Sequence, residues 1–550
     1  MGRGKTVLPG ALVAILLTLL PVTHALATPP EAEEVKDQPG AEATVTRGMP
    51  DLVRYWNFDP PKSPLFDLER VTISGDVRVR PEYRNNSNFG LVNTSEVGRA
   101  TGAASQGSAA QFVQQWTRLG LNYAMSPDVD SFIQMQYSKN WGANNAPTAA
   151  NDPNTLTSVG VRQAYMLIRN LGVDGLSLKA GRQLIVMGNH RLFGNFDWNN
   201  IGFSFDGVTL QYSQKMYEVW GGWIRLADAQ GNAANSSCGT GTTGCAGGSG
   251  AVNPGTVAGG TTGSNNADLF FARIAIMPIA GLSLEPLWVF LNNNASVTTP
   301  SVATTYYGTA AHAPGQQRHT LGGRASFRRG LFDGTAEYYW QTGSMALGQS
   351  PNRLHINAHA MAFEGGVTFA DVPWMPRVGL EFNYASGDGS ANSCNGQTGA
   401  GCGGNANTFE NLYPTNHILM GYADRMAWRN MVGYSASLQM KPSLEQQLDF
   451  RFWVFRKANN GDCWYTASQG CFSAPTTATA ANIATSNSLY KEIDGVYTLF
   501  FKDDKVAWQT GLSYLIAGQM LDQLAAGNAA GRGASAVNSI WAYTQLHVNF

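Results

Sequence analysis

Segments in which apolar and polar residues alternate are the feature that most constrains the fold of this chain. In the segment 71–84, one face of an extended strand carries Val71, Ile73, Val77, Val79 and Tyr83, and the other carries Asp76, Arg78, Arg80, Glu82 and Arg84. After residue 27 no run of about eighteen apolar residues occurs, so the sequence offers no membrane-spanning helix. A soluble β-sandwich and a β-barrel in lipid both remain compatible with such strands.

The number and spacing of these segments favour the membrane barrel. Eighteen candidate strands occur, an even number, and short turns such as Ser126–Asp128, 278–281, 329–330, 441–443 and 502–504 alternate with long connections. We therefore predict an all-β fold, a single transmembrane antiparallel β-barrel of about 18 strands. The candidate strands are 70–84, 111–125, 129–141, 161–170, 175–185, 203–213, 216–227, 267–277, 281–291, 317–328, 331–342, 357–370, 376–386, 427–441, 446–457, 488–501, 505–515 and 537–550.

The first seventy residues predict export from the cytoplasm. Arg3 and Lys5 precede an apolar run over 7–22, and Ala25-Leu26-Ala27 is typical of a cleavage site, so residues 1–27 are predicted to be a signal peptide. Residues 28–69 are rich in Pro, Glu and Asp and predict a poorly ordered periplasmic arm before a barrel over 70–550. In this topology Phe550 ends the last strand, where we expect the outer-membrane assembly machinery to recognise it.

Composition excludes several classes of protein. Only 14% of the residues are charged, which is low for soluble domains, and the formal net charge is −1. Without a basic excess, nucleic acid is not an expected partner. We expect the lipid of the bacterial outer membrane instead.

The six cysteines fall in three local pairs: Cys238 with Cys245, Cys394 with Cys402, and Cys463 with Cys471. Each pair lies inside one long Gly-, Ser- and Asn-rich connection, so we predict three disulfides that close small extracellular loops. A zinc site is the alternative, but these spacings lack a neighbouring CxxC or a histidine pair, and we predict no metal and no cofactor.

Motifs that would indicate catalysis are absent from the sequence. The histidines of the mature chain are scattered, with no HExxH or GxSxG pattern. His417 near Asp424, and Glu492 near Asp494, are acid/base candidates, yet a wet barrel interior requires many such groups without any catalysis. We predict that the protein is not an enzyme, with a barrel hydrolase as the weaker alternative.

Selectivity is expected to reside in the inward-facing residues. Strand periodicity places ten basic and nine acidic side chains toward the lumen, so the two signs nearly cancel. A row of arginines forms a path for anions, whereas mixed charges can instead brace neighbouring strands and leave a general diffusion pore for small solutes. The residues predicted in this way to line the pore are Arg78, Arg80, Arg118, Arg324, Arg377, Arg429, Arg451, Glu381, Glu492 and Asp494.

Three blocks of sequence resemble the alginate export family of bacterial outer-membrane porins. The first runs from Gly181-Arg-Gln183 through Gly188–Gly194 and Asp197-Trp198 to Ser204–Gly207; the second runs from Tyr384–Asp388 through Thr408–His417 to Gly421, Asp424 and Asn430; the third is Lys491–Asp494 with Tyr497, Gly511 and Gly518. The resemblance implies a monomeric eighteen-stranded barrel in which loops constrict an arginine-lined pore. It also suggests that the loop of the first block folds over the lumen, which adds Arg191 to the predicted pore-lining residues. It also implies an anionic permeant, with a polyuronate such as alginate as the polymer.

Overall fold

The computed structural model describes residues 66–68, 70–87, 89–90, 109–141, 159–227, 267–293, 316–346, 353–389, 405–467, 486–501, 505–527 and 535–550. The predicted signal peptide, most of the predicted arm and the segment 502–504 lie outside these ranges. So do Cys238, Cys245, Cys394, Cys402 and Cys471. No helix in the described ranges is long and apolar enough to cross a membrane.

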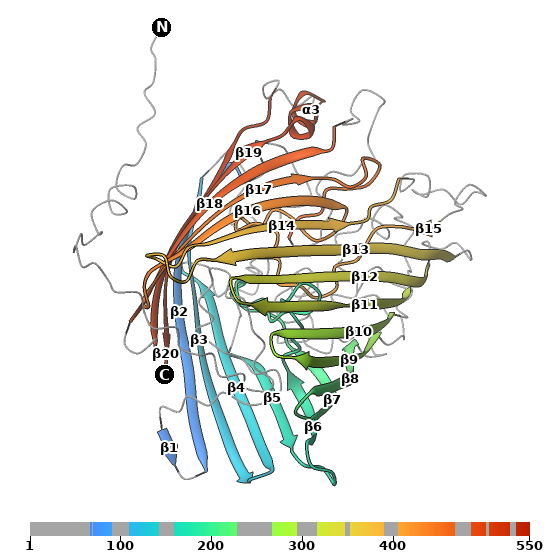
Figure 1. The fold of residues 1–550 in the computed structure, drawn as a ribbon, viewed down its shortest axis with the longest axis vertical. Helices are drawn as coiled ribbons and strands as arrows, with labels where there is room; N and C mark the ends of the chain where they lie inside the picture. The colour runs from blue at the N-terminus through green and yellow to red at the C-terminus, as the bar shows by residue number, and fades with distance from the viewer. Residues whose placement is uncertain are drawn as a thin grey trace.

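Eighteen antiparallel strands form one closed barrel, which confirms the predicted fold class. Each strand pairs with its neighbour in the chain, and β2 pairs with β20 to close the sheet (Figure 1). The barrel strands are β2 (Val71–Asn85), β3 (Ala110–Ser126), β4 (Val129–Asn140), β5 (Gly160–Ile168), β6 (Leu176–Gln183), β7 (Phe205–Ser213), β8 (Tyr217–Ala227), β9 (Ala267–Ile279), β10 (Leu282–Asn293), β11 (Gln316–Arg329), β12 (Phe332–Ala346), β13 (Arg353–Thr368), β14 (Arg377–Ala385), β16 (Met431–Ser443), β17 (Gln446–Arg456), β18 (Ser488–Phe501), β19 (Val506–Ala517) and β20 (Ser539–Asn549).

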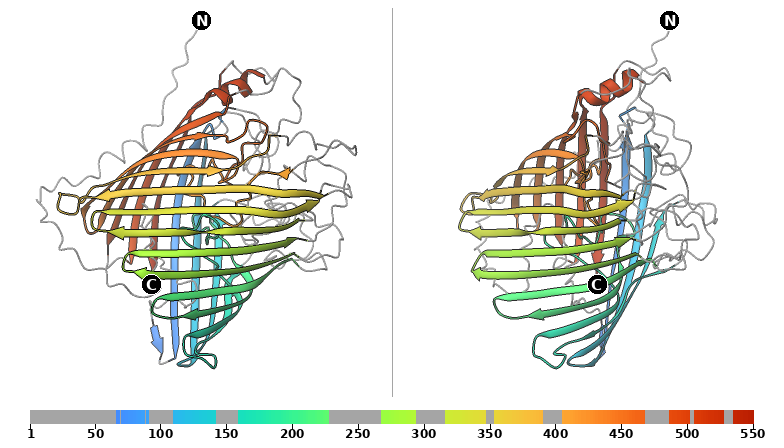
Figure 2. Two further views of the ribbon diagram at one scale, coloured as in Figure 1. Left: turned by 45° about the vertical axis from the view of Figure 1, so that its right-hand side comes forward. Right: turned by 90° about the vertical axis from the view of Figure 1, so that its right-hand side faces the viewer.

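Three short elements complete the described structure. β1 (Phe66–Leu68) pairs with the start of β2, so the end of the predicted arm joins the sheet. β15 (Asn405–Ala406) lies parallel to β13, and helix α3 (Gln519–Gly527), which the sequence did not predict, lies between β19 and β20. Figure 2 shows the strands of the two halves of the sheet facing each other across the interior.

The two faces of each strand differ as the alternation predicts. In β4, Gln134, Gln136 and Ser138 are buried inside the barrel, whereas Ile133 and Met135 are exposed on the outer surface. Polar groups thus face the interior and apolar groups face lipid, the reverse of a soluble protein.

All long connections leave from one end of the barrel. Tight turns join β3 to β4, β9 to β10 and β11 to β12 at the opposite end, where β2 begins and β20 ends. Phe550 continues the last ladder, because its N–H donates to the Gly75 carbonyl at 2.9 Å and the Gly75 N–H donates to its carbonyl at 2.8 Å. Short turns and both ends of the barrel mark the periplasmic side.

Two predicted strands are shifted along the chain. The range 357–370 becomes β13, Arg353–Thr368, and so begins four residues earlier than predicted. The range 427–441 becomes β16, Met431–Ser443, because β16 pairs with β14 only from Met431 onward. Residues 441–443, expected as a turn, are the end of this strand.

Candidate functional site

Two long connections fold back into the barrel, and none of the residues 184–204 and 407–430 within them is exposed. We call residues 184–204, between β6 and β7, the first inner loop, and residues 407–430, between β14 and β16, the second inner loop. Both bury apolar side chains in one cluster with the barrel wall. They also bind each other, since Gly194 N–H donates to Tyr413 O at 2.8 Å and Tyr413 N–H donates to Leu192 O at 2.8 Å. The rings of Phe193 and Tyr413 lie 5.7 Å apart.

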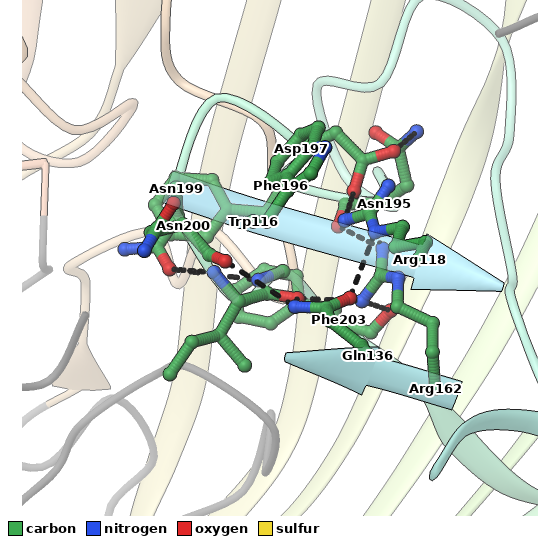
Figure 3. Close-up of polar contacts among 12 residues, drawn as sticks. Trp116, Arg118, Gln136, Arg162, Asn195, Phe196, Asp197, Asn199, Asn200 and Phe203 are labelled. Carbon is green, nitrogen blue, oxygen red and sulfur yellow. Dashed lines mark hydrogen bonds and ion pairs between the residues drawn. The ribbon is translucent and has the colours of Figure 1, made fainter. Parts of the chain in front are cut away.

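Arginines of β3 and β5 hold the first inner loop against the barrel wall (Figure 3). The Asp197 carboxylate accepts hydrogen bonds from Arg118 of β3 at 2.8 Å and from Arg162 of β5 at 2.7 Å, both through Oδ1. Asn195 donates to the other oxygen, Oδ2, at 2.8 Å. Burial by itself raises the pKa of Asp197, but the positive charges of Arg118 and Arg162 outweigh it and hold the pKa below its ordinary value. Asp197 is therefore a carboxylate at neutral pH.

The backbone of the same loop binds two arginines of β2. Arg78 donates to the carbonyl of Asp197 at 2.7 Å and to that of Trp198 at 3.2 Å. Arg80 donates to Trp198 O at 2.8 Å and to Glu82 at 2.8 Å. Together with Arg118 and Arg162, these side chains place four guanidinium groups around two loop residues. We call these four arginines the arginine wall.

Trp198 is enclosed between the wall and the second inner loop. The guanidinium carbon of Arg80 lies 3.8 Å from the centre of a Trp198 ring, and the His417 ring stacks on Trp198 at 3.7 Å with an interplanar angle of 2°. Because both groups lie within 4 Å of the Trp198 ring, they cannot occupy the same face of it. The Trp198 ring is therefore stacked between the Arg80 guanidinium on one face and the His417 imidazole on the other. His417 Nδ1 lies 3.1 Å from Asp424 Oδ2, and burial lowers the pKa of His417 despite this carboxylate.

A second set of ion pairs anchors the other part of the first inner loop. Arg191 lies 2.5 Å from Glu381 Oε1 and 3.1 Å from Glu337 Oε1. Arg451 of β17 pairs with Glu381 Oε2 at 3.1 Å. Glu381 therefore links Arg191 of the loop to Arg451 of the barrel strand β17, and the side chains of Arg191, Glu337, Glu381 and Arg451 are all buried.

The other predicted pore residues lie apart from these two groups. Arg324 and Arg273 both pair with Glu285, and Arg377 pairs with Asp333 at 2.5 Å. Arg273 and Arg324 brace neighbouring strands in the manner of cross-strand pairs, whereas Arg377 of β14 reaches across β13 to Asp333 of β12.

The structure corrects the predicted position of Arg429, which was expected on a barrel strand. This residue lies in the second inner loop, two residues before β16, with its guanidinium carbon 4.2 Å from the centre of the Tyr465 ring. The strand begins later than predicted, so strand periodicity does not apply to this residue.

The predicted acidic residues of β18 contact the second inner loop and β19. Glu492 Oε1 accepts from the Ala423 N–H at 2.8 Å, and Asp494 Oδ1 accepts from the Ser513 hydroxyl at 2.5 Å. Both are buried, and the described residues contain no group of three or more His, Cys, Asp or Glu arranged to hold a metal ion.

Arg162 and Asp197 belong to this candidate site, although the sequence did not predict either of them to line the pore. Arg162 and Gln163 are both buried, because β5 carries a bulge where its register with β4 shifts near Gln134. A bulge adds one residue and reverses the alternation beyond it, so counting from Tyr165 places Arg162 on the wrong face. Asp197 lies in a loop, where no periodicity is available.

Cys463, the one described cysteine, is disulfide-bonded, and its partner lies outside the described ranges. The predicted pairing with Cys471, like the other two pairings, stays a prediction. Asp462, beside Cys463, accepts from the Thr408 hydroxyl at 2.6 Å and so connects this segment to the second inner loop.

The sequence profile of the family described as "Alginate export" matches residues 69–237 and 264–532. The chain belongs to the alginate export family. The suggested resemblance is thereby confirmed, and this member of the family is a channel of the bacterial outer membrane. No curated protein matches its sequence.

Solved structures similar to this family member come from Pseudomonas aeruginosa. OpdQ has a TM-score of 0.47 at 10% identity, over 87% of this chain and 97% of that one. OccK8 (OprE) has a TM-score of 0.47 at 9% identity, over 87% and 98%. OccK5 (OpdH) has a TM-score of 0.46 at 8% identity, over 88% and 99%.

Proposed function

We propose that this outer-membrane channel passes anionic solutes, with a carboxylated sugar polymer such as a polyuronate as its largest permeant. One observation carries the proposal: the four guanidinium groups of the arginine wall, from β2, β3 and β5, converge on the carboxylate and carbonyl oxygens of one loop. Arginine's forked donors match carboxylates, and a series of such sites passes anions when no single site holds them too tightly.

In this structure the arginine wall binds oxygen atoms of the first inner loop, which occupy the positions that the oxygens of an anionic permeant would take. The Asp197 carboxylate binds Arg118 and Arg162, and loop carbonyls bind Arg78 and Arg80. A solute carboxylate entering here can replace Asp197 with a similar set of charge-assisted hydrogen bonds. The loop and the permeant would then compete for the same arginines, which couples passage of an anion to displacement of the loop.

Arg78 is the member of the wall best suited to attract an anion. Its guanidinium carbon lies 3.4 Å from the centre of a Trp116 ring, and its hydrogen bonds go to two carbonyls. Within the described ranges it forms no ion pair, so no carboxylate directly neutralises its charge. The Trp116 side chain faces the lumen and donates to Asp76 at 2.5 Å.

A general diffusion pore is the second candidate function, and specific ion pairs favour it. Glu381 pairs with two arginines, Glu285 pairs with two more, and Asp333 pairs with Arg377. Arginines whose charge is neutralised in this way stabilise the barrel strands and do not attract a permeant.

We propose a channel in preference to a barrel hydrolase because of the setting of His417. Its ring lies flat against Trp198, and the residue is only 1% exposed, so an ester or peptide substrate has no approach to the imidazole. General-base catalysis requires such an approach.

The reversal potential in a salt gradient across a planar bilayer tests the proposal. We expect the wild-type channel to prefer chloride over potassium, and Arg78→Gln to reduce that preference. Arg329→Gln, an exposed arginine at the periplasmic end of β11 that shares the outer-face parity of Leu321 and Phe327, is the matched control and should leave selectivity unchanged. Reversal potential reports selectivity separately from conductance, so a variant that also loosens the loop remains interpretable. Zero or cation selectivity in the wild-type channel would contradict the proposal.

We also propose that the assembly machinery recognises the last strand through Phe550. The residue ends the strand that closes the barrel, and its backbone pairs with Gly75. Phe550→Ala should slow the appearance of the heat-modifiable folded form in cells, whereas Asn549→Ala should not. Equal assembly of both variants would contradict this role.

A further inference from the structure

The outward face of the barrel changes character along strands β10 to β13. Toward the periplasmic turns its side chains are apolar, as at Leu284 and Phe363, both exposed. Toward the long loops the same face of β11 and β13 carries three histidines, a glutamine, an asparagine and an arginine, and β10 to β13 present no carboxylate there. The polar residues are Gln317, His319, Arg353, His355, Asn357 and His359.

Strand register brings the central members of this group into adjacent rows. His319 is opposite Thr342, which is opposite Asn357. In the row below, Trp340 is opposite His359. We call His319, Asn357 and His359 the outward polar patch.

Aromatic neighbours occupy one hydrogen-bonding atom of each member of the patch. Trp288 Nε1 donates to His319 Nδ1 at 3.3 Å, and Trp340 Nε1 donates to Asn357 Oδ1 at 3.0 Å. The Tyr338 hydroxyl lies 2.8 Å from His359 Nδ1, and donates to it when the imidazole proton is on Nε2.

These contacts use the acceptor atoms of the patch and leave its hydrogen-bond donors available on the outer surface. A neutral imidazole that accepts at Nδ1 carries its proton on Nε2, and an asparagine that accepts at Oδ1 still has two N–H groups to donate. In the described part of the chain no partner takes the Nε2 donors or the Asn357 amide N–H groups. Such a surface complements a ligand rich in acceptors, above all an anion.

The depth of the patch matches the headgroup region of the outer leaflet. Phe332, exposed at the periplasmic turn, and Trp340 are both on the outer face of β12. Between them the strand covers roughly 20 Å of depth, at about 3.4 Å per residue and a tilt of about 40°. The apolar band of such barrels is about 25 Å tall, so the rows at and above Trp340 lie at its outer edge.

We infer that the outward polar patch binds the phosphorylated headgroup of the glycolipid of the outer leaflet, lipid A. Its phosphates supply acceptors and negative charge, and its sugars lie against the aromatic rings of Trp288 and Trp340. Charge complementarity supports this occupant, because Arg353 lies on this face and the described parts of β10 to β13 present no carboxylate there. The surface is on the lipid side of the wall, so the inference is independent of what passes through the lumen.

Native mass spectrometry of the full-length barrel, titrated with bisphosphorylated lipid A in phosphatidylcholine vesicles, tests the inference. We expect the triple variant His319→Ala, Asn357→Ala, His359→Ala to bind lipid A about tenfold more weakly, or by about 1.4 kcal/mol. The matched control is Gln115→Ala, because Gln115 accepts from Trp141 Nε1 at 2.9 Å on the wall formed by β3 and β4. It should bind lipid A as the wild type does.

A second arm uses the wild-type protein alone and so does not depend on the folding of a variant. Lipid A from which both phosphates have been removed should bind wild type as weakly as intact lipid A binds the triple variant. Equal binding of intact and dephosphorylated lipid A would overturn the inference, as would undiminished binding by the triple variant. Reversal potential should be the same in the triple variant and the wild type, so failure here leaves the proposed anion path intact.

Discussion

Replacing Asp197 by asparagine should release the first inner loop from the arginine wall. The carboxylate accepts from Arg118 at 2.8 Å and from Arg162 at 2.7 Å, and both guanidinium groups are almost completely buried. The amide keeps one acceptor oxygen but loses the charge that two arginines share. The closed position of the loop therefore loses stability relative to any position in which water reaches these arginines.

The magnitude follows from the burial of the three groups. Removing one partner of a fully buried ion pair costs about 3–5 kcal/mol, and a hydrogen bond to a charged group contributes about 1.5–3 kcal/mol. The Asp197 side chain is 16% exposed. Because asparagine still accepts one hydrogen bond, we expect the substitution to destabilise the closed loop by about 2–3 kcal/mol. This loss shifts the equilibrium between closed and open loop roughly 30- to 150-fold toward the open state.

Single-channel recording in planar bilayers measures this shift as a rise in open probability. The control is Asp206→Asn, since Asp206 pairs with Arg182 at 3.3 Å just after the loop but on the outer face of the barrel. Asp206→Asn should behave as wild type. Open probability that is the same in Asp197→Asn and wild type would refute the reasoning that this carboxylate holds the loop.

Acid should reproduce the effect in the wild-type channel. The pKa of Asp197 in the folded protein lies below its ordinary value, so the ion pairs stabilise the closed loop at pH values above that ordinary value. This stability is lost as the pH falls through the lowered pKa of the folded protein. Open probability should rise in that acidic range in wild type and should change much less in Asp197→Asn.

Three further predictions concern the anchoring of the loops. Glu381→Gln should weaken the attachment of the first inner loop by about 2–4 kcal/mol, because it removes the charge between two buried arginines, and limited proteolysis should then cleave within 184–204. Gly202→Ala should lower the thermal midpoint of unfolding and raise open probability, because φ of Gly202 is +77° and an added Cβ would lie 2.7 Å from the Arg162 guanidinium. Gly172→Ala is the control for backbone strain alone, since φ of Gly172 is +71° and an added Cβ would meet nothing within 4 Å. An equal effect of the two variants would contradict the steric argument. Cys463→Ser should destabilise its extracellular segment by about 2–3 kcal/mol without preventing insertion, and non-reducing peptide mapping that finds a partner other than Cys471 would contradict the predicted pairing.

The sequence by itself determined the barrel. A period of two specifies which side chains share a face, and the alternation of short and long connections specifies which end of each strand faces the periplasm. Arg78, Arg80 and Arg118 were predicted to face inward for this reason, and all three are buried inside the barrel. Trp116, two residues before Arg118 and so on the same face of the strand, is buried inside the barrel as well.

Tertiary structure alone decided what those arginines bind. Arg78 contacts a carbonyl 119 residues away, and Arg191 contacts a carboxylate 190 residues away, on strands and loops whose proximity exists only once the sheet has closed. The position of Arg162 depends on a bulge, and that of Arg429 on where β16 begins pairing. Periodicity carries information along one strand, but it contains none about a loop that folds into the lumen, because the loop's position depends on contacts with several strands together.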